Sequence, residues 1–150
     1  MMETLYTAEV TARGGREGEV RSSDGVLSLK LVTPKGLGGP GGDLTNPEQL
    51  FAAGYAACFE NAILHVGRAR KVRVGATSVT ARVSIGPMGD GRFGLAVELD
   101  VRLPELDHAA AEEIVAAADL VCPYSNAVRN NVVVLITVDP SREALAATAP

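Results

Sequence analysis

Two cysteines, Cys58 and Cys122, are the only thiols in this chain, and each lies in a distinctive local sequence. Cys58 lies within the apolar run LFAAGYAACF, and Cys122 ends a second apolar run and is followed directly by PYSN. Two thiols that meet in the fold can alternate between dithiol and disulfide, a two-electron redox couple that needs no bound cofactor. If they do not meet, they are two small core residues, the commonest role of a free cysteine. The local patterns alone leave both interpretations open.

A reactive Cys58 needs a nearby cation, because the thiolate is the nucleophile and an unperturbed cysteine has a pKa of about 8.5. The residue lies roughly three turns inside an expected helix, too deep for the helix dipole to ionise it. Arg16, in the glycine-flanked segment GGREG, is a candidate for that cation. Glu48 is a candidate for orienting the guanidinium through a two-pronged ion pair. Each also has a simpler interpretation, as a solvated loop arginine and as a glutamate that complements the helix dipole.

The spacing of Glu48 and Cys58 restricts how one arginine could serve both. They are ten residues apart, which is about 15 Å along a continuous helix. One arginine does not bridge that distance within one subunit. Either the helix breaks near Gly54, or the Glu48 of each site comes from a partner chain. We favour the second option, which predicts an obligate dimer with two composite sites.

Other arrangements of the reactive groups fit the sequence less well. His65 follows Cys58 by seven residues, which places it about 10.5 Å further along the helix. A hydrolase dyad of these two residues therefore requires a bend in the chain. A zinc site built from Cys58, Cys122, His65 and His108 has four ligands but lacks the usual close pairs. The glycine-proline segment 33–42 is not followed by Gly-Lys-Ser/Thr, so we expect a connecting loop and not a phosphate cradle.

Composition limits the class of protein. The chain has 150 residues, 47% hydrophobic and 21% charged, with a net charge of −4. It lacks the clustered basic surface of a nucleic-acid-binding protein, because its one basic run, RARKVR, follows an expected helix end. We expect no secretory signal and no membrane span, and hence a cytoplasmic location. In the cytosol a disulfide is usually catalytic or regulatory, which favours chemistry at the two cysteines.

The elements that must position these residues are a mixture of strands and helices. Asn46, Pro47 and Gln49 predict the start of the cysteine helix, and Gly67 is its expected end. Asp107 is the expected cap of a second helix that runs to about Val121, with a further short helix from Pro123. Strands are expected over 4–12, 19–22, 26–31, 76–85, 92–103 and 132–138, with a DG turn after the second and a hairpin loop over 86–91.

The resulting order, βββ-α-ββ-α-β, indicates an α+β fold with antiparallel sheets in a single domain over residues 1–150. We expect the tail over about 140–150 to be frayed. The cysteine helix is apolar nearly all round as far as Leu64, which suits a core or a subunit interface.

Three segments resemble the organic hydroperoxide resistance (Ohr) branch of the Ohr/OsmC family. They are GGREG at 14–18, NPEQLFAAGYAACF at 46–59 and VCPYSNA at 121–127. The similarity extends from about Thr4 to Val138 and includes the order and spacing of the blocks. The NPEQ and CPYS blocks together are a far more specific signature than either cysteine. The CPYS context favours the Ohr branch over the sister OsmC branch, which would share the chemistry with another substrate range.

The resemblance implies a peroxidase of the oxidative stress response that reduces alkyl, aryl and fatty-acid hydroperoxides to alcohols. In it, Cys58 matches the peroxidatic cysteine, which forms a sulfenic acid, and Cys122 the resolving cysteine, which closes a Cys58–Cys122 disulfide. Arg16 matches the arginine that polarises the thiolate, and Glu48 the glutamate that holds it. The implied fold is OsmC-like, with sheets packed around a central buried helix in an intertwined homodimer. The implied reductant is an external dithiol, such as the lipoyl group of a lipoylated protein, with no bound cofactor or metal.

Two points stay open at this stage. Glu60 and Asn61 depart from the small or apolar residues expected after the cysteine, which concerns the shape of the pocket, and the substrate-binding residues are not identified. From a different class, a redox sensor or a hydrophobic-ligand binder could carry the same cysteines without turnover.

Overall fold

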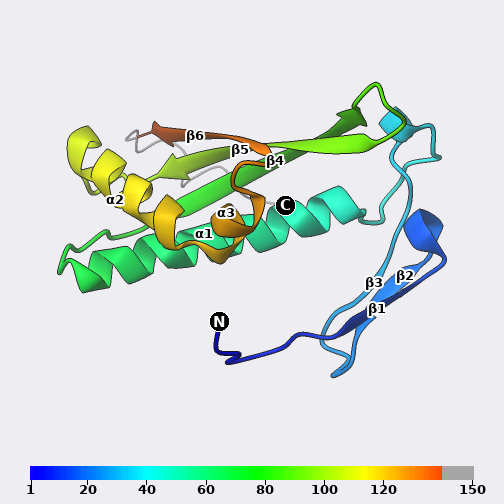
Figure 1. Cartoon of the computed structure of the whole chain (residues 1–150), viewed down its shortest axis with the longest axis horizontal. Coiled ribbons are helices and arrows are strands. Elements are labelled where there is room, and N and C mark those ends of the chain that lie inside the picture. The colour runs from blue at the N-terminus through cyan, green and yellow to red at the C-terminus, as the bar shows by residue number, and fades with distance from the viewer. Residues whose placement is uncertain (140–150) are drawn as a thin grey trace. The chain divides into compact units, whose positions relative to one another are not determined.

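The structure is a computed structural model in which residues 1–139 are described. The elements follow the predicted order of strands and helices, with the short extra helix after Cys122 and two 3-10 turns (Figure 1). The chain divides into two compact units, Met1–Leu50 and Phe51–Pro150. The single domain expected over residues 1–150 stays a prediction. The tail expected to fray lies outside the described residues.

The first unit contains an antiparallel sheet in the order β1-β2-β3. Its strands are β1 Val10–Arg13, β2 Glu19–Ser22 and β3 Ser28–Lys30. The predicted DG turn is confirmed, because Gly25 has φ 74° and the Ser22 hydroxyl donates to the Asp24 carboxylate (2.6 Å). The strands predicted over 4–12 and 26–31 are shorter than expected, because β2 offers only four residues for pairing.

This first sheet has no fully buried residue on either face in the single chain. Val10 is 48% exposed and Leu29 is 37% exposed. A small sheet needs a covered apolar face to be stable in water. The first unit by itself therefore supplies no layer that covers this sheet.

The long helix α1, Pro47–Ala69, has the predicted N-terminus. The Asn46 side-chain oxygen accepts a hydrogen bond from the Gln49 backbone N–H (2.9 Å). The second half of the predicted capping box is wrong, because the Gln49 side-chain oxygen accepts from the Thr45 hydroxyl (2.7 Å). Gly54 does not interrupt the helix. In the described part of the chain, neither α1 nor any other helix is long and apolar enough to cross a membrane.

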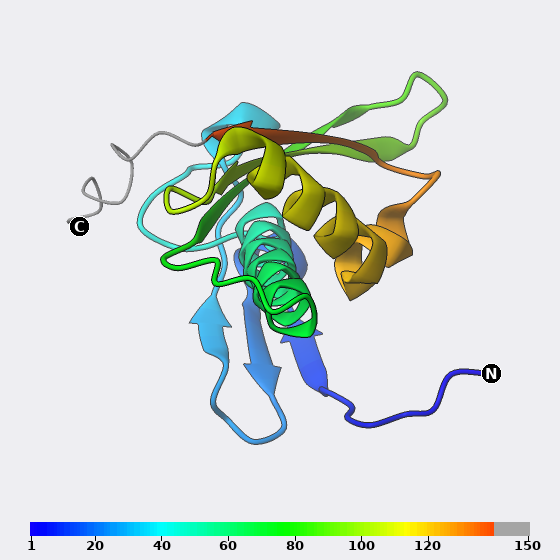
Figure 2. The ribbon, with the colours of Figure 1, turned by 90° about the vertical axis from the view of Figure 1, so that its left-hand side faces the viewer.

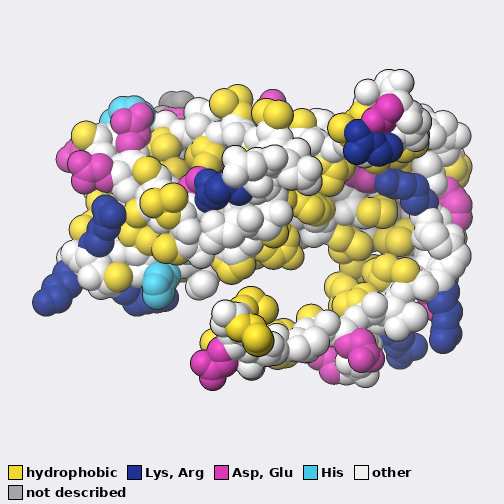
Figure 3. All heavy atoms as spheres, in the orientation of Figure 1, with side chains coloured by type: hydrophobic (Ala, Val, Ile, Leu, Met, Phe, Trp, Pro, Cys, Tyr) yellow, Lys and Arg dark blue, Asp and Glu magenta, His cyan; other side chains and the backbone are white. Residues whose placement is uncertain are grey.

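The prediction that Gly67 ends α1 is wrong. A Cβ at this position would lie 2.8 Å from Cγ1 of Val74, so the glycine is required for close packing. The helix ends after Ala69, where Lys71 takes a left-handed φ of 56° and the Val72 N–H donates to the Gly67 carbonyl (2.9 Å). The basic side chains of the RARKVR run gather at this end, where cations complement the helix dipole (Figure 3).

The second unit contains a sheet in the order β4-β5-β6. Its strands are β4 Ser78–Pro87, β5 Phe93–Arg102 and β6 Val133–Asp139. β4 and β5 form the predicted antiparallel hairpin, but β6 pairs parallel with β5, so the prediction of purely antiparallel sheets is wrong. Between β5 and β6 the chain passes through α2 His108–Val121 and α3 Pro123–Val128. This crossover returns the chain to the end where β5 begins, as a parallel neighbour requires.

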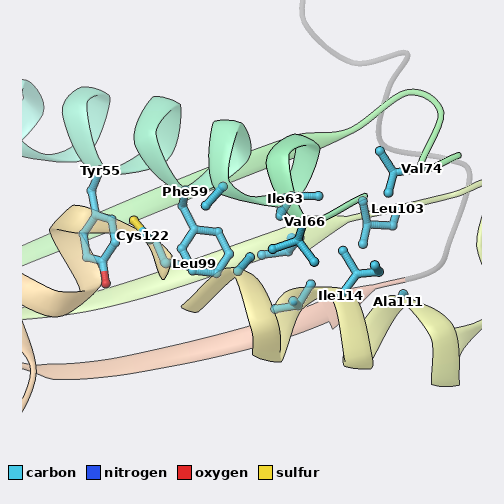
Figure 4. Packing of buried hydrophobic residues seen from close by; sticks show 14 of the residues in the cluster. Tyr55, Phe59, Ile63, Val66, Val74, Leu99, Leu103, Ala111, Ile114 and Cys122 are labelled. Carbon is cyan, nitrogen blue, oxygen red and sulfur yellow. The ribbon is translucent and has the colours of Figure 1, made fainter. Parts of the chain in front are cut away.

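The core of the second unit lies between its sheet and its helices. Figure 2 shows α1 and α2 on the same side of the β4-β5-β6 sheet. Asp107 caps α2 as predicted, accepting a hydrogen bond from the Ala110 N–H (2.8 Å). Side chains from three elements meet in this core: Tyr55, Phe59 and Ile63 of α1, Val97, Leu99 and Val101 of β5, and Ala111, Ile114 and Ala118 of α2. Figure 4 shows part of this cluster, with Phe59, Leu99 and Ile114 labelled.

Replacement of Gly67 by alanine tests the packing at the end of α1. Alanine in a helix interior normally stabilises by about 0.5–1 kcal/mol relative to glycine. Here the added methyl group would press on Val74, and we expect a net destabilisation of about 1–3 kcal/mol in urea unfolding. The double variant Gly67→Ala/Val74→Ala, compared with Val74→Ala alone, should recover the loss. A stabilised Gly67→Ala protein would contradict the packing role.

Candidate active site

The two cysteines are held by different helices of the second unit. Cys58 lies in the middle of α1, partly exposed and packed against the core. Cys122 caps the N-terminus of α3 in extended backbone, with φ −66° and ψ 121°, and is 0% exposed. Pro123 follows it at the first position of α3. Because proline has no N–H to donate, it separates α2 from α3 and so defines the position of Cys122.

The two thiols lie near each other, which confirms that the fold brings the distant cysteines together. Both are free, and they are close enough for Cys122 to raise the pKa of the Cys58 thiol. Figure 4 shows Cys122 among the buried side chains of the core, near Tyr55 and Phe59. The arrangement places a partly exposed thiol next to a buried one.

Burial has the largest effect on the Cys58 thiol and raises its pKa above the ordinary value, because a thiolate is poorly solvated there. The neighbouring Cys122 raises the pKa further, while a hydrogen bond from the Tyr124 backbone N–H lowers it. Tyr124 occupies the second position of α3, and Pro123 before it has no N–H. With these contacts alone Cys58 stays protonated at neutral pH. A nucleophilic Cys58 therefore needs a cation.

Arg16 and Glu48 form a two-pronged ion pair within the first unit. The guanidinium donates from Nη1 to Oε2 (2.8 Å) and from Nη2 to Oε1 (2.5 Å) of Glu48. These hydrogen bonds are the main reason that the pKa of Arg16 is raised and that of Glu48 is lowered. The Arg16 side chain is 34% exposed and that of Glu48 is 13% exposed. The guanidinium is thus held on one side and accessible on the other.

Arg16 is presented by a turn that requires glycine. Gly14 has φ 79°, in the left-handed region that favours glycine. A Cβ on Gly18 would overlap the carbonyl oxygen of Arg13. The GGREG segment therefore gives the arginine a defined position, and a solvated loop arginine is the weaker interpretation.

The two residue pairs belong to different units: Arg16 with Glu48 to the first, and Cys58 with Cys122 to the second. The alternative of a helix broken near Gly54 is wrong, because α1 is continuous. Glu48 and Cys58 of one chain therefore stay about 15 Å apart along the helix axis.

The histidines have other roles. Across residues 1–139, no three His, Cys, Asp or Glu side chains converge where they could hold a metal ion. His108 pairs with Glu112 on the exposed surface of α2 (3.1 Å). His65 is exposed on α1, and on this unbroken helix it lies about 10.5 Å beyond Cys58. The chain has no bend there that would form the hydrolase dyad.

Glu60 and Asn61, the two residues that depart from the family pattern, lie in different environments. The Glu60 carboxylate accepts a hydrogen bond from the Thr77 hydroxyl (2.7 Å), which ties α1 to the segment before β4. Asn61 is exposed. The Glu60 carboxylate is thus engaged in a structural contact.

Sequence reasoning missed a buried hydrogen bond beside the cysteines. Tyr55 Oη and Ser125 Oγ are 2.9 Å apart, and both side chains are buried. Tyr55 precedes Cys58 by three residues, and Ser125 follows Cys122 by three. Residues three apart share a helix face, so this spacing was an available signal.

Comparison with known proteins identifies the family. A family model described as OsmC-like protein matches residues 39–137. The organic hydroperoxide resistance protein of Xanthomonas axonopodis pv. citri is 51% identical over 137 residues, which covers 91% of this chain and 96% of that protein. This chain belongs to the OsmC-like family, among the organic hydroperoxide resistance proteins. The resemblance seen in the three sequence segments is confirmed.

Solved structures of organic hydroperoxide resistance proteins share this fold. OsmC from Legionella pneumophila aligns with a TM-score of 0.88 at 49% identity, covering 91% of this chain and 99% of that one. A protein of Vibrio cholerae O1 biovar eltor aligns with a TM-score of 0.87 at 51% identity, covering 91% and 94%. That protein has captopril bound in one of its active sites. The OsmC-like α+β fold, with two three-stranded sheets and helices, is therefore shared by this member.

The Arg16–Glu48 pair of this OsmC-like protein makes its stability depend on pH. Because the pKa of Glu48 is lowered by folding, the stabilisation is complete above the unfolded pKa of about 4.3 and is lost as the pH falls through the folded pKa. We expect Glu48→Gln to reduce the free energy of unfolding at neutral pH by no more than about 1 kcal/mol, since water screens the pair.

Urea unfolding over a pH series measures this effect. The difference between wild type and Glu48→Gln should shrink below about pH 4, and Arg16→Met should show the same pH window. A difference that stays constant into strong acid would argue against the ion pair.

Proposed function

We propose that this protein is a thiol-dependent peroxidase that reduces alkyl, aryl and fatty-acid hydroperoxides to alcohols, as an antioxidant enzyme of the cytoplasm. The observation that carries the proposal is the meeting of two free thiols, one partly exposed and one buried. The names of the similar proteins, which refer to organic hydroperoxide resistance, support it.

In the first step, the Cys58 thiolate attacks the distal oxygen of the hydroperoxide and the O–O bond breaks. The alkoxide leaves and takes up a proton to become the alcohol, and the sulfur is oxidised by two electrons to a sulfenic acid. Arg16 keeps Cys58 ionised and stabilises the charge on the departing alkoxide, while Glu48 orients Arg16. Because Cys58 packs against an apolar core, an alkyl or aryl tail gains about 25 cal/mol per Å² of buried surface, which favours organic hydroperoxides over hydrogen peroxide.

In the second step, the Cys122 thiol attacks the sulfenic sulfur, the Cys58–Cys122 disulfide forms and water leaves. An external dithiol then restores both thiols. Since Cys122 is fully buried by its own chain, the incoming thiolate attacks Cys58, and Cys122 leaves and takes up a proton. The second thiol of the reductant releases Cys58 and closes the disulfide of the reductant. A small dithiol, or the lipoyl group of a lipoylated protein, fits this sequence.

The active form in this proposal is a homodimer with two composite sites. Arg16 pairs with the Glu48 of its own chain, and that carboxylate is about 15 Å along α1 from the Cys58 of the same chain. The Arg16–Glu48 pair of one chain would therefore serve the Cys58 of the partner. The sheet left uncovered in the first unit supports a partner chain, because it offers surface for an interface.

Substitution of each cysteine tests the chemistry. With cumene hydroperoxide and excess dihydrolipoamide, Cys58→Ser should lose turnover entirely. Without a dithiol, Cys122→Ser should consume about one equivalent per chain and then stop, because its sulfenic acid has no resolving thiol. After one equivalent of hydroperoxide, intact mass should show the loss of two hydrogens in the wild type and the gain of one oxygen in Cys122→Ser.

A disulfide that forms without catalytic consumption would instead indicate a redox sensor, and no thiol oxidation would indicate a ligand binder. Faster turnover of hydrogen peroxide than of cumene hydroperoxide would reject the substrate preference.

Mixed dimers test the composite site. Cys58→Ser and Arg16→Met chains should each be inactive as homodimers. A heterodimer of the two retains one complete site, formed by Cys58 of the second chain and Arg16 of the first. Random mixing should therefore restore about a quarter of the wild-type activity per site. If Arg16 served the Cys58 of its own chain, the heterodimer would stay inactive, and so would a mixture of stable monomers.

A further inference from the structure

Two contacts, one helical turn apart, join α1 to the start of α3. One is the contact between the Cys58 and Cys122 thiols, and the other is the Tyr55–Ser125 hydrogen bond (2.9 Å). The residues of the second contact are three positions from those of the first on each helix. Tyr55 and Cys58 therefore share one face of α1, and Ser125 lies in the first turn of α3, directly after Cys122 at its N-cap. In Figure 4 the Tyr55 side chain extends from α1 toward the region that holds Cys122.

The first turn of α3 also fits a recess in α1. A Cβ on Gly54 would lie 2.5 Å from Tyr124 Oη, so only glycine leaves space for this ring. The Tyr124 ring packs against Tyr55, with ring centroids 5.7 Å apart, and against Phe51 at 6.2 Å. These contacts limit where the turn that carries Cys122 can lie along α1.

Next to the Tyr55–Ser125 hydrogen bond, α3 is not closely packed on all sides. A cavity of about 170 Å³ lies beside the Tyr55–Ser125 hydrogen bond. Its lining comes from α1, α2, α3 with its C-cap, and β6, and includes Tyr55, Asp119, Ser125, Val128, Arg129 and Val134. Free volume at this place could accept a displacement of the first turn of α3, while Arg129 at the far end of α3 stays bound to Asp119 of α2 (3.1 Å).

A buried hydroxyl pair is a directional contact in a core that is otherwise apolar. Tyr55 is 0% exposed and Ser125 is 2% exposed. Phenylalanine and alanine would fill nearly the same volume, and the net gain in stability from one hydrogen bond is modest. The two hydroxyls can form their hydrogen bond only when α3 lies at one position along α1. If α3 were shifted along α1, both hydroxyls would be buried without a hydrogen-bond partner. At this same position of α3, the two sulfur atoms lie near each other.

We propose that Tyr55 and Ser125 are positioning residues, whose hydrogen bond holds Cys122 at the distance and orientation at which it can form a disulfide with Cys58. The inference rests on the proposed function for its biological meaning, since it concerns the second chemical step. Neither hydroxyl touches the reacting oxygen. Both act through the placement of Cys122.

The equilibrium between the dithiol and the disulfide tests this directly. In a glutathione buffer, the constant for forming the Cys58–Cys122 disulfide measures the effective concentration of one thiol at the other. We expect Tyr55→Phe and Ser125→Ala each to lower this constant about tenfold, a change of about 30 mV for a two-electron couple. The double variant should be no lower than the singles, because the two hydroxyls act through one bond.

Thr77→Val is the matched control. It also removes a hydroxyl that tethers α1, through Glu60 (2.7 Å), but this tether leads to the segment before β4 and not to α3. Its thermal stability should fall as in the test variants while its disulfide constant stays at the wild-type value. Wild-type constants in Tyr55→Phe and Ser125→Ala, or an equal drop in Thr77→Val, would overturn the proposal.

A kinetic measurement separates the two steps. With cumene hydroperoxide, Ser125→Ala should form the Cys58 sulfenic acid nearly as fast as the wild type but close the disulfide more slowly. The longer-lived sulfenic acid should then be oxidised to sulfinic acid at a lower hydroperoxide dose, which intact mass detects. Equal slowing of both steps would overturn the positioning role.

The glutathione measurement uses no hydroperoxide, so its outcome is independent of the peroxidase proposal. If the wild-type disulfide formed in glutathione but the protein turned over no hydroperoxide, the proposed peroxidase function would be wrong. The positioning role of Tyr55 and Ser125 would not be affected.

Discussion

A thiol that packs against an apolar core is shielded from water, but the same shielding opposes the ionisation that makes it a nucleophile. Cys58 shows this opposition directly: burial and the neighbouring Cys122 both raise its pKa, and one backbone N–H counteracts them. A compensating cation must be close enough to act and held firmly enough not to return to water. Arg16, fixed by the two-pronged contact with Glu48, has the features that such a cation needs.

The continuous helix α1 carries both Glu48, which holds the cation, and the Cys58 thiol. Its first turn carries Glu48, which fixes the guanidinium, and its middle carries the thiol. Since the helix is rigid, these residues of one chain are kept apart by about 15 Å. In the proposed dimer one helix would serve two sites, supplying the anchor of one and the nucleophile of the other. The first sheet fits this arrangement, because an interface would bury surface that the first unit by itself does not cover.

Local signals in the sequence predicted most elements, because caps and turns depend on contacts within a few residues, as at Asn46. Predictions were wrong where a contact with a residue distant in the sequence determines the local structure. Gly67 looks like a helix end until Val74 is seen to need its space, and β6 pairs parallel because the chain crosses back through two helices. The cysteines and the ion pair could be chosen from their chemistry and the family resemblance. The Tyr55–Ser125 bond was missed although its spacing from the cysteines was visible, because the fold decides which side chains 70 positions apart meet.

The burial of Cys122 has a consequence for how the proposed enzyme meets its two substrates. If only the sulfur of Cys58 can be reached from outside, the hydroperoxide and the reductant must use the same entrance, and they cannot bind together. The cycle is then of the ping-pong type, with the disulfide form as the species that the reductant meets.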